Sequence, residues 1–173
     1  MYNGFMESID NKIIESIKSK YDLIDIELEQ KLVLHKQPNG KILAGITFYN
    51  DLQDKCFYLF DIQDNGTSEE YEFIPVAQIK FLLYKNDTVF IRRLEFINQD
   101  YKGKGYASCL ISFFEEYCHR HNYQLITGEL IPLHNEPFEN VKKFYTRNGY
   151  KISTINGQNM ISKVVEQTEQ NVF

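Results

Sequence analysis

The sequence predicts a single α/β domain built on a mixed, mostly antiparallel sheet flanked by helices. In the first half, apolar residues recur at every second position in several short runs, which is typical of antiparallel strands. In the second half, runs with strand and helix spacing alternate, which is typical of a βαβ unit. No stretch of the 173 residues reads as a linker. We therefore expect one domain over 1–173, with an N-terminal helix and antiparallel strands in 1–86, a core in 87–165 and a tail in 166–173.

The elements expected in the first half begin with a helix over 6–20, whose isoleucines share one face. A strand over 23–36 follows, and the turn QPNGK leads into a hairpin partner over 42–48. A further strand is expected over 55–62. The second half of 71–85 also alternates like a strand, but Pro75 argues against one unbroken strand throughout.

The elements expected in the second half begin with a strand over 89–97, whose apolar residues on both faces favour a central position in the sheet. A helix with one apolar stripe is expected over 108–121. The remaining elements are a strand over 123–130, a helix over 136–147 with Pro137 in its first turn and Gly149 just past its end, and a hairpin of 150–155 and 160–165 around Asn156 and Gly157.

The segment between the central strand and the helix after it, Asn98 to Ala107 (NQDYKGKGYA), carries the strongest signal of function. A loop that opens directly into a helix leaves backbone N–H groups without partners at the positive end of the helix dipole. Gly103 and Gly105 permit close backbone approach, and Lys102 and Lys104 add positive charge. This combination predicts a phosphate site, although a solvated turn explains the loop alone equally well.

Two nucleotide-binding motifs are absent from this loop. The Walker pattern G-x-x-x-x-G-K-[ST] does not occur, and Ser108 stands where G-x-G-x-x-G requires its third glycine. A phosphate ligand of another kind is therefore favoured.

The stretch INQDYKGKGYA resembles the acyl-CoA loop of the GNAT superfamily of N-acyltransferases, which follows the central strand with the pattern [Q/R]-x-x-G-x-[G/A]. Lys102, Gly105 and Ala107 stand at the three patterned positions. Lysine replaces the usual arginine or glutamine. It keeps the charge of arginine but lacks its planar fork, so we expect a looser phosphate contact.

A second block, KKFYTRNGYKI at 142–152, resembles the later GNAT block A-x-x-[FL]-Y-x-x-x-G-[FY]. Phe144 and Tyr145 match its F-Y pair, and Gly149 and Tyr150 match its G-F pair. Two such motifs in this order, with one strand between them, are far more specific than either alone.

One position departs from the family pattern. Phe138 stands where many members place an asparagine that helps to hold the pantetheine arm, and Asn135 and Asn140 are the nearest replacements. The resemblance covers about half of the chain, from Ala77 to Val165.

The resemblance implies a GNAT-like fold with a splay between its two central strands, and acetyl-CoA as the acyl donor. The pantetheine arm would lie in the gap against the backbone of 95–97, because parted strands expose N–H and C=O groups that need partners. The residues implied to contact coenzyme A are Phe96, Ile97, Lys102, Gly103, Lys104, Gly105, Tyr106, Ala107, Asn140 and Tyr145.

The resemblance also implies three catalytic candidates. Tyr145 would protonate the leaving thiolate, although its phenol could simply continue an aromatic helix face. Glu95 and Glu129 are the nearest carboxylates that could accept the amine proton, and each could instead be a solvated or ion-paired group. The backbone N–H of Glu95 is a candidate oxyanion donor.

The charge distribution bears on the partners. Residues 1–86 carry 14 acidic and 9 basic side chains, whereas 87–173 carry 10 of each. This balance argues against a nucleic-acid surface, which needs a basic face. The acidic first half is compatible with a cationic amine acceptor, and solvated acidic loops explain it about as well.

The remaining composition indicates a cytoplasmic protein without a membrane partner. No apolar run approaches the roughly 20 residues of a membrane helix, and the first residues do not resemble a signal peptide. Cys56, Cys109 and Cys118 lack the spacing of a metal site, so we expect no metal and reduced thiols.

The sequence thus predicts an acetyltransferase that moves an acetyl group from acetyl-CoA to a primary amine by direct transfer in a ternary complex. Two alternatives stay open: a GNAT-shaped module that binds coenzyme A or a partner without catalysis, and an enzyme acting on a protein or peptide amine. A homodimer is compatible with the sequence.

Overall fold

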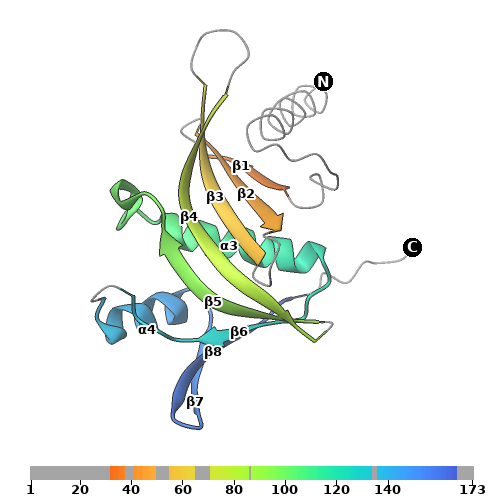
Figure 1. Cartoon of the computed structure of the whole chain (residues 1–173), viewed down its shortest axis with the longest axis vertical. Helices are drawn as coiled ribbons and strands as arrows, with labels where there is room; N and C mark the ends of the chain where they lie inside the picture. The colour runs from red at the N-terminus through yellow and green to blue at the C-terminus, as the bar shows by residue number, and fades with distance from the viewer. Residues whose placement is uncertain are drawn as a thin grey trace.

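The described parts of the chain form one mixed sheet with helices packed on it (Figure 1). The computed structural model describes residues 32–37, 41–49, 55–64, 71–85, 87–133 and 136–166. Within them the sheet has eight strands in the order β1-β2-β3-β4-β5-β6-β8-β7, and every neighbouring pair is antiparallel except β5 and β6. The predicted mixed, mostly antiparallel α/β fold is confirmed.

The strands are β1 (Leu32–Lys36), β2 (Ile42–Tyr49), β3 (Lys55–Asp64), β4 (Tyr71–Tyr84), β5 (Thr88–Phe96), β6 (Leu125–Glu129), β7 (Lys151–Ile155) and β8 (Gln158–Val164). The helices are η1 (Gln99–Tyr101), α3 (Tyr106–Arg120) and α4 (Phe138–Arg147).

Most predicted elements in the described residues are present within a few residues of the expected bounds. β5 lies between β4 and β6, as its apolar residues on both faces indicated. The turn of the last hairpin has positive φ at Asn156 and Gly157, which suits a tight hairpin turn. The helix expected over 6–20 and the start of the strand expected from residue 23 lie outside the described residues.

One prediction was wrong, because β4 runs through Pro75 as a single strand of 14 residues. Phe60 of β3 pairs with Pro75 and Leu59 pairs with Ala77, so Val76 is an extra residue in the ladder. This irregularity is a β-bulge, one of the few places inside a sheet that tolerate proline. The sequence thus indicated an irregularity at Pro75, but the irregularity is a bulge and not an interruption of the strand.

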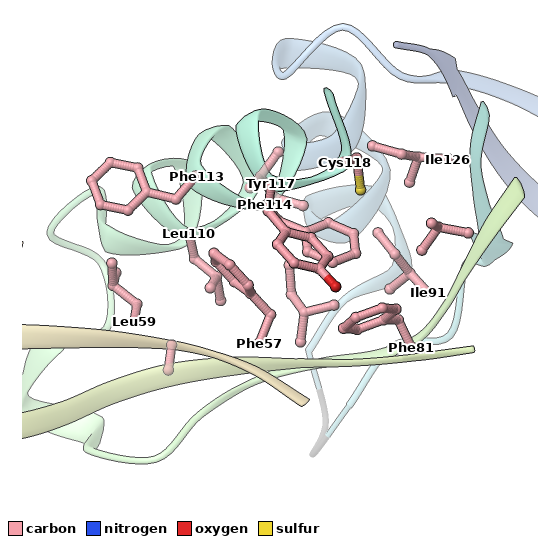
Figure 2. Close-up of a cluster of buried hydrophobic side chains, with 14 of the residues drawn as sticks. Phe57, Leu59, Phe81, Ile91, Leu110, Phe113, Phe114, Tyr117, Cys118 and Ile126 are labelled. Atoms are coloured by element: carbon pink, nitrogen blue, oxygen red, sulfur yellow. The ribbon is translucent and has the colours of Figure 1, made fainter. Parts of the chain in front are cut away.

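The core lies between the sheet and α3 (Figure 2). Phe57 and Phe81 point from β3 and β4 toward the helix, where they meet Phe114 and Tyr117. All four side chains are almost completely buried. The predicted apolar stripe of the helix over 108–121 is therefore the face that packs on the sheet.

Proline and glycine mark the two ends of α4. Pro137 occupies the N-cap of α4, one position before the first turn in which it was expected, and Gly149 follows the C-cap with φ +85°. Cys56, Cys109 and Cys118 are free thiols. Among the residues that the structure describes, no helix has the length and apolar character needed to cross a membrane.

Candidate functional site

The parallel strands β5 and β6 run together for four residues and then separate. Their register joins Thr88–Ile91 to Leu125–Gly128, whereas β5 continues to Phe96. β6 ends at Glu129, and the next residue donates its N–H to the carbonyl of Asn159 in β8 at 2.7 Å. The predicted splay is therefore present. Beyond this register, the edge of β5 that faces β6 has no strand partner among the described residues.

Two features mark the point where the strands separate. A Cβ at Gly128 would lie 2.6 Å from the carbonyl oxygen of Ile91, so only glycine lets the two backbones approach this closely. On the β4 side, the register of β5 steps from Ile91 to Arg93 and leaves Arg92 as the extra residue of a β-bulge. Tight approach on one side and a bulge on the other turn β5 away from its neighbour.

A cavity of about 840 Å³ lies between the parted strands, the loop before α3, and α4. In Figure 1, α4 lies below the arrowhead of β5, near β6. A volume of this size is within the range of ligand sites. Of the predicted site residues, Ile97, Lys104 and Tyr106 are not part of the lining. Those that line the cavity are Glu95, Phe96, Lys102, Gly103, Gly105, Ala107, Glu129, Asn140 and Tyr145.

The loop at the open end of the cavity presents bare backbone N–H groups. Gly103 and Gly105 have φ of +78° and +87°, and Gly105 is the N-cap of α3 without a side-chain capping bond. Among the described residues, no group accepts a hydrogen bond from the N–H groups of 103–107. The first turn of α3 contains no acidic residue. The loop therefore has the donors and the dipole that an anion needs.

The two lysines of the loop lie in different surroundings. Lys102 Nζ is 2.7 Å from Glu136 Oε2, in an ion pair that joins the loop to the segment before α4. Lys104 lines a smaller pocket behind the loop, together with Asp61 and Tyr106. Alternation of lysine and glycine gave no sign of this division, because it depends on the path of the turn. Glu136 was not among the predicted residues.

Tyr145 lies in α4 with only 7% of its surface exposed. Its ring packs against Phe144 and Tyr150, with centroids 5.1 and 5.4 Å away. Burial raises the pKa of the Tyr145 phenol well above its ordinary value. The side chain lines the cavity, and its hydroxyl has no hydrogen-bond partner among the described residues. The phenol is thus a neutral hydrogen-bond donor on a residue that lines the cavity.

The two candidate carboxylates differ in their partners. Glu95 accepts a hydrogen bond from Gln78 Nε2 at 2.6 Å, and its carboxylate lies 3.0 Å from Arg93 Nε and 3.5 Å from Lys80 Nζ. Glu129 makes no ion pair or side-chain hydrogen bond with any described residue. It directly follows Gly128, at the closed end of the splay. Glu95 is therefore the ion-paired group that the sequence allowed for, and Glu129 faces the cavity without a partner.

Asn140, one of the two candidates to replace the family asparagine, is exposed and lines the cavity. Asn135 lies outside the described residues. Phe138, at the family asparagine position, packs instead against the edge of the core. Sequence reasoning missed Gly128, although an isolated glycine inside a strand is a known sign of close backbone approach. The sequence indicated Arg92 or Arg93 as an ion-pair partner of Glu95, and Arg93 takes that role. It did not indicate that Arg92, Arg93 and Arg147 line the cavity.

No family model matches the sequence, and no curated protein matches it. Solved structures are similar at low identity. They include Tetrahymena GCN5 (12% identity, covering 68% of this chain and 72% of that chain, TM-score 0.48) and the ribosomal-protein-S18-alanine N-acetyltransferase from Escherichia coli (11%, 72% and 77%, TM-score 0.47). A third is an acetyltransferase of the GNAT family from Staphylococcus aureus Mu50 (12%, 64% and 69%, TM-score 0.46). These are similarities of outline and assign no activity to this chain. In its strand order, its splayed central pair and the glycine turn before α3, the chain has a GNAT-like fold.

Proposed function

We propose that this protein transfers an acetyl group from acetyl-CoA to a primary amine within a ternary complex. The observation that carries the proposal is that a strand edge without a strand partner, and backbone N–H groups without acceptors among the described residues, border the same cavity. β5 ends at Phe96, and η1 connects it to the loop at 102–107. One extended ligand with amides at one end and a diphosphate at the other would complete both.

The donor would occupy the cavity along β5. From Arg92 to Phe96 the strand spans about 13 Å at 3.3 Å per residue, which is long enough for an extended amide-bearing arm to lie beside it as a strand. The N–H groups of 103–107 would hold the diphosphate, and Lys102 would add its charge. Acetyl-CoA supplies the thioester from which an acetyl group can be transferred.

At the closed end of the cavity, Glu129 is our choice to bind the incoming amine and accept its proton. Its carboxylate has no competing partner among the described residues, whereas Arg93, Lys80 and Gln78 surround that of Glu95. A carboxylate already held by two cations and an amide is less available to bind an incoming amine than one without such partners. We assign Glu95 to shaping the cavity wall.

Tyr145 is our choice of proton donor to the departing thiolate. Its raised pKa keeps the phenol protonated at neutral pH, so it always presents a proton to the cavity. Transfer from phenol to thiolate is unfavourable in water, because a thiol has a pKa of about 8.5. Burial raises the pKa of a thiol as well as that of the phenol, so it does not by itself remove this difference, and the transfer depends on the phenol lying beside the sulfur.

The acceptor is an amine on a small molecule or a peptide. The second candidate function is a module that binds without catalysis, and one observation favours it: the ion pair between Lys102 and Glu136 engages the loop cation. Release of free thiol from acetyl-CoA, measured with a panel of amines and peptides, separates the two functions. Transfer requires thiol release that depends on the acceptor, and a binding module releases none.

The loop assignment is tested by Gly105→Glu, with coenzyme A affinity measured by calorimetry. A carboxylate at the anion site should weaken binding by about a hundredfold or more, because it repels the diphosphate at close range. Gly157→Glu is the matched control. Its φ of +80° is as strained as that of Gly105, a Cβ there also meets no atom within 4 Å, and it lies in the remote β7–β8 turn. Equal affinity in the two folded variants would refute the assignment.

A further inference from the structure

A buried carboxylate lies behind the loop, on the side away from the cavity. Asp61 in β3 has no exposed surface. Its Oδ2 is 2.7 Å from Lys41 Nζ and accepts hydrogen bonds from the Tyr101 hydroxyl at 2.9 Å and from Gln63 Nε2 at 3.4 Å. Among the described residues, no group donates a hydrogen bond to its Oδ1. Burying a carboxylate carries a large desolvation cost, so a fully buried one calls for a structural or functional reason.

Two tyrosines of this cluster lie at the two ends of the glycine turn. Tyr101 precedes residues 102–105 and Tyr106 follows them as the first residue of α3. Lys41 Nζ donates to the Tyr106 hydroxyl at 2.6 Å and lies 5.4 and 5.1 Å from the centroids of the two rings. The rings themselves meet edge to face, with centroids 4.9 Å apart. One lysine–aspartate pair therefore fastens both ends of the turn to the sheet.

Residues 102–105 of the turn make few side-chain contacts on the side that faces Asp61. A Cβ added at Gly103 or Gly105 would meet no atom within 4 Å. Lys104 is exposed, and Lys102 points to the opposite side, toward Glu136. The conformation of 102–105 thus depends on its end points, Tyr101 and Tyr106.

We propose that Asp61, acting with Lys41 through Tyr101 and Tyr106, is a positioning residue that fixes the glycine turn with its N–H groups toward the cavity. This inference rests on the proposed function of the loop as the diphosphate site. It gives a role to a buried charge that does not line the main cavity.

Two members of the cluster stay protonated in neutral and mildly alkaline solution. Desolvation and the hydrogen bond to Asp61 raise the pKa of Tyr101 to about 12, so it remains a donor. Desolvation lowers the pKa of Lys41, but its bonds to Asp61 and Tyr106 outweigh this and raise the pKa overall. Both side chains therefore keep donating to the cluster over this range.

Asp61→Asn should change coenzyme A affinity in opposite directions, depending on whether Asp61 acts only through its charge or by positioning the turn. Removing a negative charge near an anion site should tighten coenzyme A binding if charge alone matters. If Asp61 positions the turn, its loss should weaken binding instead. Asp100→Asn is the matched control, because Asp100 lines the same pocket and carries the same charge but is exposed. We expect this control to bind coenzyme A as tightly as the natural chain or more so.

Two measurements test the proposal. Backbone ¹⁵N relaxation should show the order parameters of Gly103 and Gly105 falling from about 0.85 to about 0.6 in Asp61→Asn, with β5 and α3 unchanged. Calorimetry should show coenzyme A binding weakened by about tenfold, while binding of pantetheine, which lacks the diphosphate, stays the same. A merely structural role would loosen the whole fold and weaken both ligands.

Tyr101→Phe carries the same test if Asp61→Asn does not fold, because it removes one hydroxyl and keeps the ring. Unchanged order parameters in whichever variant folds would overturn the proposal, and so would loosening spread evenly over the chain. Failure of the proposed function looks different: the natural chain would not bind coenzyme A, whereas the relaxation data would still report whether Asp61 orders the turn.

Discussion

The two ends of the β5–β6 pair have opposite designs. At the paired end, Val89 and Ile91 face Ile126 in the buried core, and the strands lie in register. At the parted end, the same strand β5 carries Arg93 and Glu95 on a partly exposed face and borders the cavity. Apolar contact holds the strands together at one end, and the loss of pairing opens a polar cleft at the other. The comparison teaches that one strand serves as both core and site, and that the change occurs within two residues.

The sharpest way to disrupt the paired end is Gly128→Ala. The new Cβ would lie 2.6 Å from the Ile91 carbonyl oxygen, so the strands must shift apart. We expect the free energy of unfolding to fall by about 3 kcal/mol, as for overpacking in a rigid core. Urea denaturation followed by circular dichroism measures this loss. Gly157→Ala is the control, since it has open space and only backbone strain. A smaller loss at Gly128 than at Gly157 would contradict the close-approach argument.

The parted end is probed by Tyr145→Phe, which keeps the ring and removes the phenolic proton. Turnover should fall by about a hundredfold, near the effect of losing one proton donor, while coenzyme A affinity changes little. Steady-state kinetics and calorimetry on the same preparation give the two values. Full activity in the variant would exclude Tyr145 as the donor.

The two carboxylates of the cavity give a further test. Glu129→Gln should lower turnover by about tenfold or more, because it removes the unpartnered acceptor for the amine proton. Glu95→Gln should have a smaller effect on turnover at neutral pH, because its carboxylate is already held by Arg93 and Lys80. A pH–rate profile should show the acidic limb altered only in Glu129→Gln. The reverse ranking would exchange the two roles.

Alkaline unfolding follows from the phenols behind the cavity. Burial raises the pKa of both Tyr145 and Tyr150, whereas a phenol in the unfolded chain ionises near pH 10. The folded state binds these protons more tightly, so its stability is full below pH 10 and falls as the pH rises further. Above pH 10, each buried phenol should lower the free energy of unfolding by up to about 1.4 kcal/mol per pH unit. Denaturation series at pH 8 to 11 should show a shallower fall in Tyr145→Phe, and an unchanged slope would contradict the burial effect.

The smallest expected effect is at the mouth of the parted end. Glu136→Gln should release Lys102 from its ion pair and tighten coenzyme A binding by about twofold to threefold, since exposed pairs are worth well under 1 kcal/mol. Calorimetry at low and moderate salt measures the change. Weaker binding in this variant would mean that Glu136 supports the site.

Local pattern predicted most of the fold. Alternation located the strand β2, short apolar runs located β3 and β5, helical spacing located α3, and two motifs located the loop and Tyr145. These features depend on neighbours in sequence, so the sequence carries them directly. The register of a sheet also depends on partner strands, and for that reason β4 could continue past Pro75 through a bulge that its own sequence did not indicate.

Contacts between distant segments were beyond the sequence. Glu136 meets Lys102 across 34 residues, and Asp61 meets Tyr101 across 40. Neither pair follows from spacing, because each exists only after the loop and the sheet are placed together. The division of Lys102 and Lys104 between two sides of the loop has the same origin. Residue types predicted that an anion site was present, and tertiary structure decided which side chains surround it.

The strand order divides the sheet into two leaves: one contains β1 to β5, and the other contains β6, β8 and β7. The leaves meet at β5 and β6, which are joined by four residue pairs. A ligand bound along the part of β5 that does not pair with β6 would bridge the two leaves where the strands separate. Such a molecule binds the folded chain and not the unfolded one, so it would also raise the temperature at which the leaves come apart. Binding of such a ligand would thus be coupled to the stability of the contact between β5 and β6.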